Sequence, residues 1–128
     1  MKTATLLCLA SALGGCVSGL GINCRGSGFC PSDGAAGNLI NLKAIVDGIA
    51  DRGRGYATGQ QIACTGSLCA FFQNGASGTA GQASALLQQL LDHGCKKCGS
   101  VPTQPGNDVS RGELTVNIVG DAHCQGAC

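Results

Sequence analysis

The sequence predicts an α+β sandwich in which two helices cover one face of a sheet. Two stretches, 38–51 and 79–93, carry apolar residues at steps of three and four, as amphipathic helices do. Two others, 62–74 and 113–119, have the residue pattern that is typical of strands. Because the helical and strand patterns do not alternate strictly along the chain, both helices are expected on the same sheet face.

Residues 1–19 have the layout of a secretory signal peptide. A positive start is followed by the apolar run 4–13, which is too short to span a bilayer, and Val17 and Gly19 fit a cleavage after Gly19. The alternative is a buried first helix of the domain. We expect one secreted, extracellular domain at 20–128, with no transmembrane segment.

The first helix is expected after an extended piece and a Gly/Ser/Pro loop over 20–37. Asn38 is a good N-cap, and Gly53 is expected to end the helix, although Gly48 inside it costs about 1 kcal/mol relative to Ala. The apolar stripe consists of Leu39, Leu42, Ile45, Val46 and Ile49. A loop over 53–61 follows.

Two short strands around a Thr-Gly-Ser turn are expected within 62–74. Beyond a Gly-rich stretch, Thr79 and Gln82 have the spacing of a capping box at the start of the second helix. Gly94 suits a left-handed C-cap, so this helix delivers Cys95 at its C-terminal end. The residues that share one face are Leu68, Ala70 and Phe72 in the strands and Ala83, Leu86, Leu87, Leu90 and Leu91 in the helix.

The remaining chain is expected to contain a turn-rich connection, 99–112, and one clear strand, 113–119. Alternation along this strand puts Leu114, Val116 and Ile118 on one face. A short tail then ends at Cys128.

Charge excludes two classes of partner. Loss of Lys2 with the leader leaves seven basic and seven acidic residues, from the eight and seven of the full chain. A neutral chain has no electrostatic attraction to nucleic acid or to an anionic membrane surface, so neither is expected as a partner. With three Phe, one Tyr and no Trp, aromatic anchors for binding are scarce.

The cysteines predict a disulfide framework. Two of the ten leave with the leader, and the eight that remain are Cys24, Cys30, Cys64, Cys69, Cys95, Cys98, Cys124 and Cys128. An even number in an oxidising compartment predicts four disulfides, each worth about 2–4 kcal/mol, mostly by restricting the unfolded chain.

The stretch "DHGCKKCG" at 92–99 contains a Cys-x-x-Cys that fits a redox couple, half of a zinc site or two disulfide anchors. Cys95 and Cys98 follow a helix C-terminus, where the helix dipole disfavours a thiolate. Cys24 and Cys30 are six positions apart, outside the usual spacing of zinc ligands. Structural disulfides are therefore the favoured interpretation, with no metal and no cofactor.

The sequence contains few residues in patterns that are typical of catalytic sites, so no enzymatic activity is expected. His93 falls at a helix end as a cap, and His123 lies in the tail. Asp47 and Asp51 fall on the polar side of the first helix, and there is no G-x-S-x-G. Hydrophobins, another secreted eight-cysteine class, carry adjacent Cys-Cys doublets, which this chain lacks.

Four segments resemble the KP4 family of killer toxins. They are "LGINCRGS" at 20–27, "GNL" at 37–39, "HGCKKCGS" at 93–100 and "GNDVSRGELTVN" at 106–117, and they run in the same order through essentially the whole mature chain. The resemblance implies an antiparallel sheet of about five strands with two antiparallel helices on one face. It also implies the disulfides Cys24–Cys95 and Cys30–Cys98, and leaves the pairing of Cys64, Cys69, Cys124 and Cys128 open.

Functionally, the resemblance implies a secreted toxin that inhibits the growth of competing fungal cells by blocking calcium uptake through voltage-gated-type channels, with no enzymatic step. One departure concerns a basic cluster that precedes the mid-chain cysteine in the killer toxin. Gln60, Gln61 and Ile62 precede Cys64 here, and none of them is cationic.

Cationic side chains are what a blocker presents to an acidic channel mouth. The candidate target-binding residues are Arg52 and Arg54 in the loop after the first helix, and Arg25, Lys96 and Lys97. The leading expectation is a monomeric toxin that binds a cell-surface target such as a calcium channel. The alternative is a secreted effector or structural binding module that keeps the scaffold without toxicity.

Overall fold

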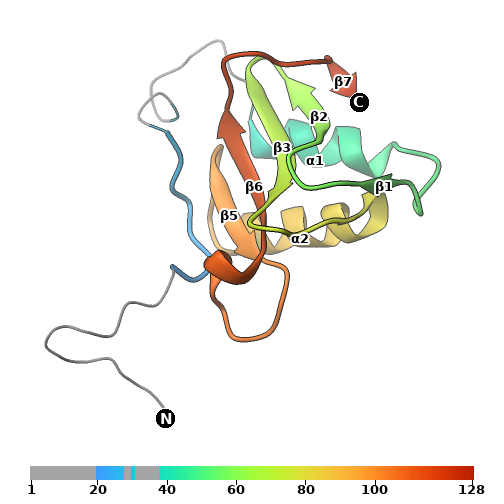
Figure 1. The fold of residues 1–128 in the computed structure, drawn as a ribbon. Helices are drawn as coiled ribbons and strands as arrows, with labels where there is room; N and C mark the ends of the chain where they lie inside the picture. The colour runs from blue at the N-terminus through green and yellow to red at the C-terminus, as the bar shows by residue number, and fades with distance from the viewer. Residues whose placement is uncertain (1–19, 28–29, 31–37) are drawn as a thin grey trace, which may run out of the picture.

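Both helices lie against one face of a five-stranded antiparallel sheet in the computed structural model, which confirms the predicted α+β class (Figure 1). The structure describes residues 20–27, 30 and 38–128, so the predicted signal peptide at 1–19 lies outside the described residues. The elements are α1 (Leu39–Asp47), β1 (Gly55–Tyr56), β2 (Gln61–Thr65), β3 (Leu68–Gln73), β4 (Gly78–Thr79), α2 (Ala80–Asp92), β5 (Gly99–Pro102), the 3₁₀ helix η1 (Val109–Arg111), β6 (Glu113–Ile118) and β7 (Gly126–Ala127).

The sheet has the strand order β5-β6-β3-β2-β7, and every neighbouring pair is antiparallel. An isolated bridge between Asn23 and Ser100 places the N-terminal segment beside β5. The C-terminal β7 lies beside β2 at the other edge. Both ends of the described chain thus cover an edge of the sheet, and β1 and β4 form a separate two-stranded ribbon.

Helix α1 begins where the sequence predicts, and the prediction of its end at Gly53 is wrong. Asn38 is the N-cap, and its side chain accepts a hydrogen bond from the Asn41 backbone at 2.9 Å. The helix ends at Gly48, whose N–H donates to the carbonyls of Ala44 and Ile45, both at 3.1 Å. Glycine is a poor helix former, so the helix stops at the first position where the chain can leave it.

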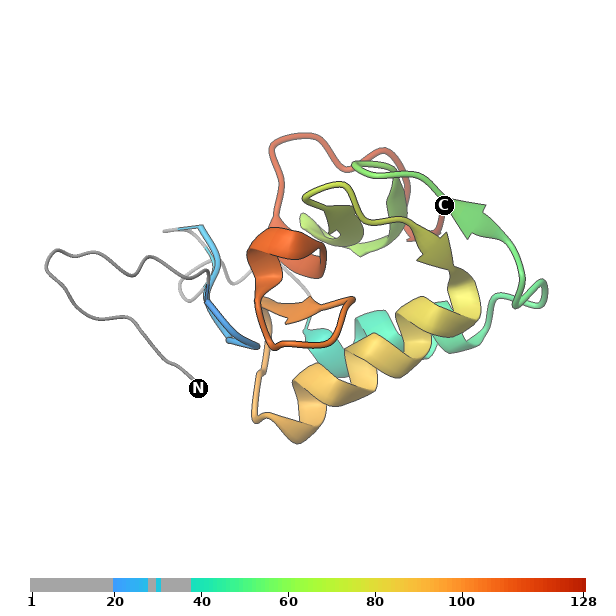
Figure 2. The same cartoon turned by 60° about the horizontal axis from the view of Figure 1, so that its bottom comes forward.

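Helix α2 matches its predicted signals. Thr79 and Gln82 form the reciprocal capping box, with hydrogen bonds of 2.8 and 3.1 Å. Gly94 has φ of 95°, the left-handed conformation expected after the last turn. The Leu39 N–H donates to the Lys96 carbonyl at 2.9 Å, so the start of α1 meets the end of α2. The two helices are therefore antiparallel, as Figure 2 shows.

The core lies between the helices and the sheet. The predicted strand faces are confirmed in β3 and β6, where Phe72 pairs with Leu114 across the sheet and both are at most 1% exposed. Strand β5 was expected as part of a turn-rich connection, and this prediction is wrong. Its residues are Gly, Ser, Val and Pro, and they become a strand because β6 provides antiparallel partners from Val116 to Glu113.

Candidate functional site

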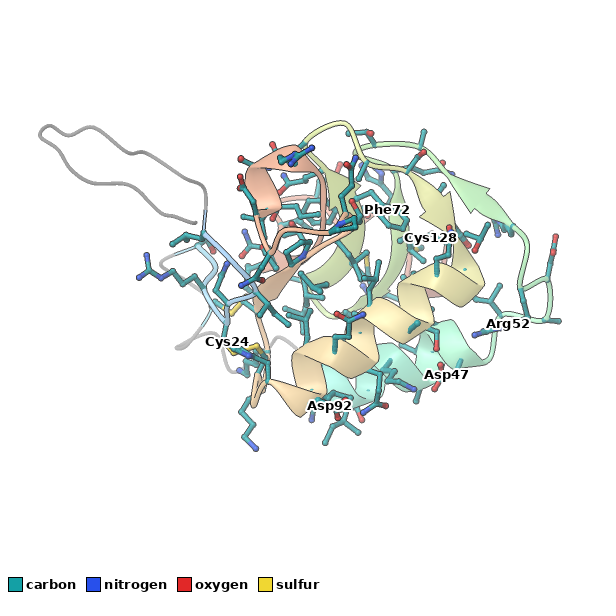
Figure 3. All side chains as sticks on the ribbon, turned by 90° about the horizontal axis from the view of Figure 1, so that it is seen from below. Cys24, Asp47, Arg52, Phe72, Asp92 and Cys128 are labelled. Atoms are coloured by element: carbon teal, nitrogen blue, oxygen red, sulfur yellow. A yellow bond between two sulfur atoms is a disulfide. The ribbon has the colours of Figure 1, made fainter. Side chains whose placement is uncertain are left out.

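Two disulfides join the N-terminal segment to the connection between α2 and β5, and they are the framework of the candidate site (Figure 3). Cys24 is bonded to Cys95 and Cys30 to Cys98, with Cα–Cα distances of 5.1 and 6.2 Å. These are the pairs that the family resemblance implies. Cys24 is exposed, whereas its three companions are at most 5% exposed, so the disulfide framework faces both the core and the solvent.

Asparagine side chains fix the backbone of 20–27 next to this framework. The hydrogen bonds to side-chain oxygens run from Ile22 to Asn107 at 2.9 Å, from Arg25 to Asn23 at 3.0 Å and from Ser27 to Asn117 at 2.9 Å. Asn23 also exchanges two backbone hydrogen bonds with Ser100, at 3.0 and 2.9 Å. The N-terminal segment is therefore held by the sheet as well as by the disulfides.

Two glycines let the backbones approach closely at this point. A Cβ at Gly26 would lie 2.5 Å from the Cys98 Cβ, and a Cβ at Gly99 would lie 2.7 Å from the Asn23 carbonyl oxygen. Real Cβ atoms are not found so close to other heavy atoms. Both positions therefore require glycine for the disulfide framework to close.

A hollow of about 630 Å³ lies between the two segments that these disulfides join. Residues 24–27 and Cys30 line one side, and residues 94–98 line the other. The hydroxyl of Ser27 is buried and has no hydrogen-bond partner in the part of the chain that the structure describes. Sequence reasoning missed Ser27 and Gly26 as site residues, because neither carries a charge nor belongs to a chemical motif.

The hollow brings together three of the five predicted target-binding residues, namely Arg25, Lys96 and Lys97. Arg25 and Lys96 are exposed. Within residues 20–27, 30 and 38–128, no hydrogen bond or ion pair engages either of these two cationic groups. The two disulfides thus gather cations that are about 70 residues apart in the sequence, as the separation of 71 between Cys24 and Cys95 indicates.

Comparison with known proteins agrees with this geometry. The Kp4 family model matches residues 6–120. The KP4 killer toxin of Ustilago maydis P4 virus is 40% identical over 117 residues, which cover 86% of this chain and 88% of the toxin. The chain belongs to the KP4 family.

Elsewhere on this KP4 scaffold, the other two predicted target-binding residues have intramolecular contacts. Arg52 lies at the end of α1, far from Cys24 (Figure 3), and donates to the carbonyls of Val46 and Asp47 at 3.0 and 3.3 Å. These carbonyls belong to the last turn of the helix, and the Val46 carbonyl also accepts from the Ile49 N–H at 3.1 Å, so Arg52 adds a side-chain cap at this end. Arg54 lies over the Tyr56 ring at 5.0 Å and donates to a backbone oxygen of the tail at 2.8 Å. The structure does not bring this pair to the hollow.

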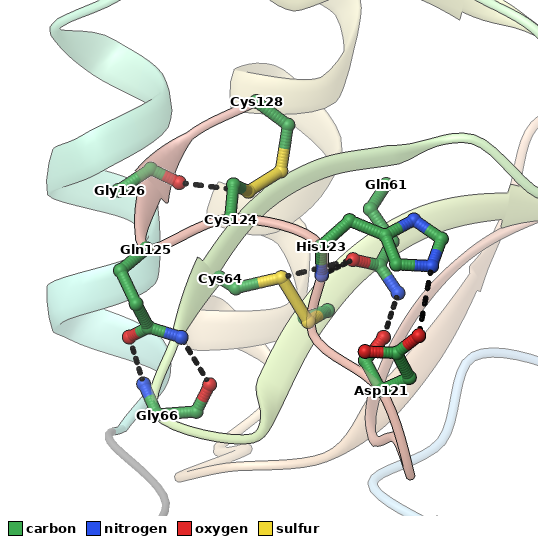
Figure 4. The surroundings of a disulfide bond; sticks show 10 residues. Gln61, Cys64, Gly66, Asp121, His123, Cys124, Gln125, Gly126 and Cys128 are labelled. Carbon is green, nitrogen blue, oxygen red and sulfur yellow. Dashed lines mark hydrogen bonds and ion pairs between the residues drawn. A yellow bond between two sulfur atoms is a disulfide. The ribbon is translucent and has the colours of Figure 1, made fainter.

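The segment before Cys64 holds the C-terminal tail (Figure 4). The Gln61 amide donates to the carbonyl of Asp121 at 2.9 Å and accepts from the backbone N–H of His123 at 2.7 Å. Gln125 makes a matching pair of hydrogen bonds to the backbone of Gly66, both at 2.8 Å. The uncharged segment before Cys64 therefore anchors the tail in this member of the KP4 family.

The remaining cysteines pair locally, as Cys64–Cys69 across the β2–β3 hairpin and Cys124–Cys128 in the tail. The Sγ atoms of Cys64, Cys124 and Cys128 lie within 4.8 Å of one another, a spacing at which thiolates can hold a metal. All three sulfur atoms are in disulfides, so none is a thiolate ligand in this state.

Among the described residues, no helix is both long and apolar enough to cross a membrane.

Proposed function

We propose that this chain is a secreted, killer-toxin-like protein that inhibits the growth of competing cells by binding a target on their outer surface. The observation that carries the proposal is the match to the KP4 killer toxin, which covers 86% of the chain at 40% identity. Residues 1–19 are its removable leader, and residues 20–128 are the active domain, which acts as a monomer and without an enzymatic step.

The target in this proposal is a calcium channel or another protein of calcium uptake. The mouths of cation channels are lined by acidic side chains. A protein that presents exposed cations is complementary to such a mouth, and Arg25 and Lys96 supply them. Binding at the mouth lowers calcium entry without any covalent chemistry.

A growth assay with controlled calcium tests this proposal. The folded protein is added to cultures of fungal competitors and to plant roots, with and without extra external CaCl₂, and growth is followed. We expect inhibition that added calcium relieves and that an equal concentration of MgCl₂ does not. Inhibition that is the same at every calcium concentration would refute the calcium channel as the target. It would still support a toxin that inhibits growth.

A second candidate function is a non-toxic effector or binding module on the same scaffold. The observation that favours it is that the segment before Cys64 carries no cation and that its Gln61 anchors the tail. A folded protein that inhibits none of the tested cells and still binds a cell-wall or receptor component would decide for this candidate.

A further inference from the structure

We infer that the hollow between residues 24–27 and 94–98 binds an acidic peptide segment of the target protein, with an apolar side chain at its floor. This inference deepens the proposed function and rests on it, because it names the part of the target protein that the hollow binds. The anionic groups of the segment meet Arg25 and Lys96 at the rim.

Two of the cations at the hollow, Arg25 and Lys96, make no side-chain hydrogen bond or ion pair to another residue of the described chain, in contrast to most cations elsewhere. Lys43 pairs with Asp47 at 2.7 Å, and Arg52 and Arg54 contact backbone oxygens. The carboxylate nearest in sequence to the lysines, Asp92, accepts from the Gln88 amide at 2.9 Å. No ion pair within the described residues neutralises the charges of Arg25 and Lys96, although the mature chain as a whole is neutral.

The floor is suited to an apolar group. The residues between the cations are half-cystines and glycines, and disulfide sulfur carries no charge and only weak hydrogen-bonding capacity. The Ser27 hydroxyl is the polar exception; it is buried and has no hydrogen-bond partner within the described residues. A partner that satisfies the site needs anionic and apolar groups together, which an acidic peptide offers and inorganic phosphate does not.

Shape favours a peptide over a membrane surface. The volume of about 630 Å³ lies within the range of about 300–1,000 Å³ that is usual for ligand sites. The site is an open, shallow depression with a cation on each side. A protruding peptide segment can lie in it and contact the half-cystines, whereas a flat lipid surface contacts only the exposed cations. The two disulfides hold both sides in place, so little conformational entropy is lost on binding.

A nuclear magnetic resonance titration of the folded, ¹⁵N-labelled protein tests this inference independently of toxicity. The probe is a capped hexapeptide of glutamate and leucine, and its control replaces every glutamate by glutamine. We expect the acidic peptide to shift the amide signals of residues 24–27 and 94–98, and the control to leave them in place. The double variant R25Q/K96Q should weaken binding about five- to tenfold, as expected for the loss of two exposed ion pairs.

The variant R111Q is the matched control, because it removes one cation from η1, outside the residues that line the hollow, and should bind the peptide like the parent. Three outcomes would overturn the inference. They are shifts that map elsewhere, equal shifts with inorganic phosphate alone, and strong binding to phosphatidylserine vesicles without peptide binding. Peptide binding without growth inhibition would leave the site in place and refute the toxin, so the two failures are distinguishable.

Discussion

The two disulfides that frame the hollow should act as one unit, and their removal singly and together measures this. Cys24–Cys95 and Cys30–Cys98 close loops with sequence separations of 71 and 68. Either of them alone restricts the unfolded chain by about 4.4 kcal/mol in the loop-entropy treatment. When one of them is already present, the other closes a ring of only about nine residues, six from the segment 24–30 and three from the segment 95–98. Closing this small ring corresponds to about 2.6 kcal/mol.

We therefore expect C24A/C95A and C30A/C98A each to lower the free energy of unfolding by about 2.6 kcal/mol, and the quadruple variant to lower it by about 7 kcal/mol. The loss in the quadruple variant exceeds the sum of the two separate losses because the long loop is released only when both disulfides are absent. Guanidinium unfolding followed by far-ultraviolet circular dichroism measures these values, since the chain has no Trp. Intact mass confirms the disulfides that remain.

The hairpin disulfide Cys64–Cys69 is the control, because its sequence separation is 5 and it shortens the surrounding 24–95 loop by only a few residues, which changes the loop entropy very little. Its removal in C64A/C69A should cost about 2.1 kcal/mol whether or not Cys24–Cys95 is present. The reasoning is refuted if either clamp disulfide alone costs about 4.4 kcal/mol, or if the quadruple variant loses no more than the sum of the two double variants.

Two further predictions concern stability. Gly26→Ala should lower the free energy of unfolding by about 1–3 kcal/mol, because its Cβ would overlap the Cβ of Cys98. The control is Gly55→Ala, where a Cβ meets nothing within 4 Å, and equal thermal melts of the two variants would contradict the prediction. Asp47 accepts hydrogen bonds from Lys43 and from Ser84 on the other helix, and these contacts hold the pKa of Asp47 below its ordinary value. Because the folded pKa is lowered, this stabilisation is present above the unfolded pKa of about 3.9 and is lost as the pH falls through the folded pKa. Melts between pH 6 and pH 2 should therefore show the stability advantage of the parent over D47N shrinking toward low pH, and a constant difference would contradict the assignment.

The elements with strong local signals could be predicted from the residues. A capping box at Thr79, a glycine at position 94 and an apolar stripe with helical spacing belong to one short stretch each, and the structure confirms all three for α2. The same local reasoning failed at Gly48, because a glycine inside an apolar stripe gives no indication of whether packing will hold it in the helix.

Strand β5 and the hollow could not be predicted in the same way. Residues 99–102 have weak strand preference, and they form a strand because β6 lies beside them. Arg25 and Lys96 are ordinary surface cations in the sequence, and eight cysteines allow 105 different pairings. The family resemblance reduced the number of possible disulfide pairings. That Arg25 and Lys96 meet around one cavity is a property of the folded chain.

The sequence by itself determined the α+β class, both helix starts, the β2–β3 hairpin and the family. Periodicity, capping residues and short family-like motifs are local features of a chain, so they can be recognised without the structure. Only the tertiary structure decided which cations can act. It places Arg52 on the end of α1 and Arg54 on Tyr56. Arg25 and Lys96, by contrast, line a disulfide-framed hollow and have no side-chain partner among the described residues. The physical reason is that the partner of a charge is set by contacts between residues distant in sequence, and no local pattern encodes those contacts.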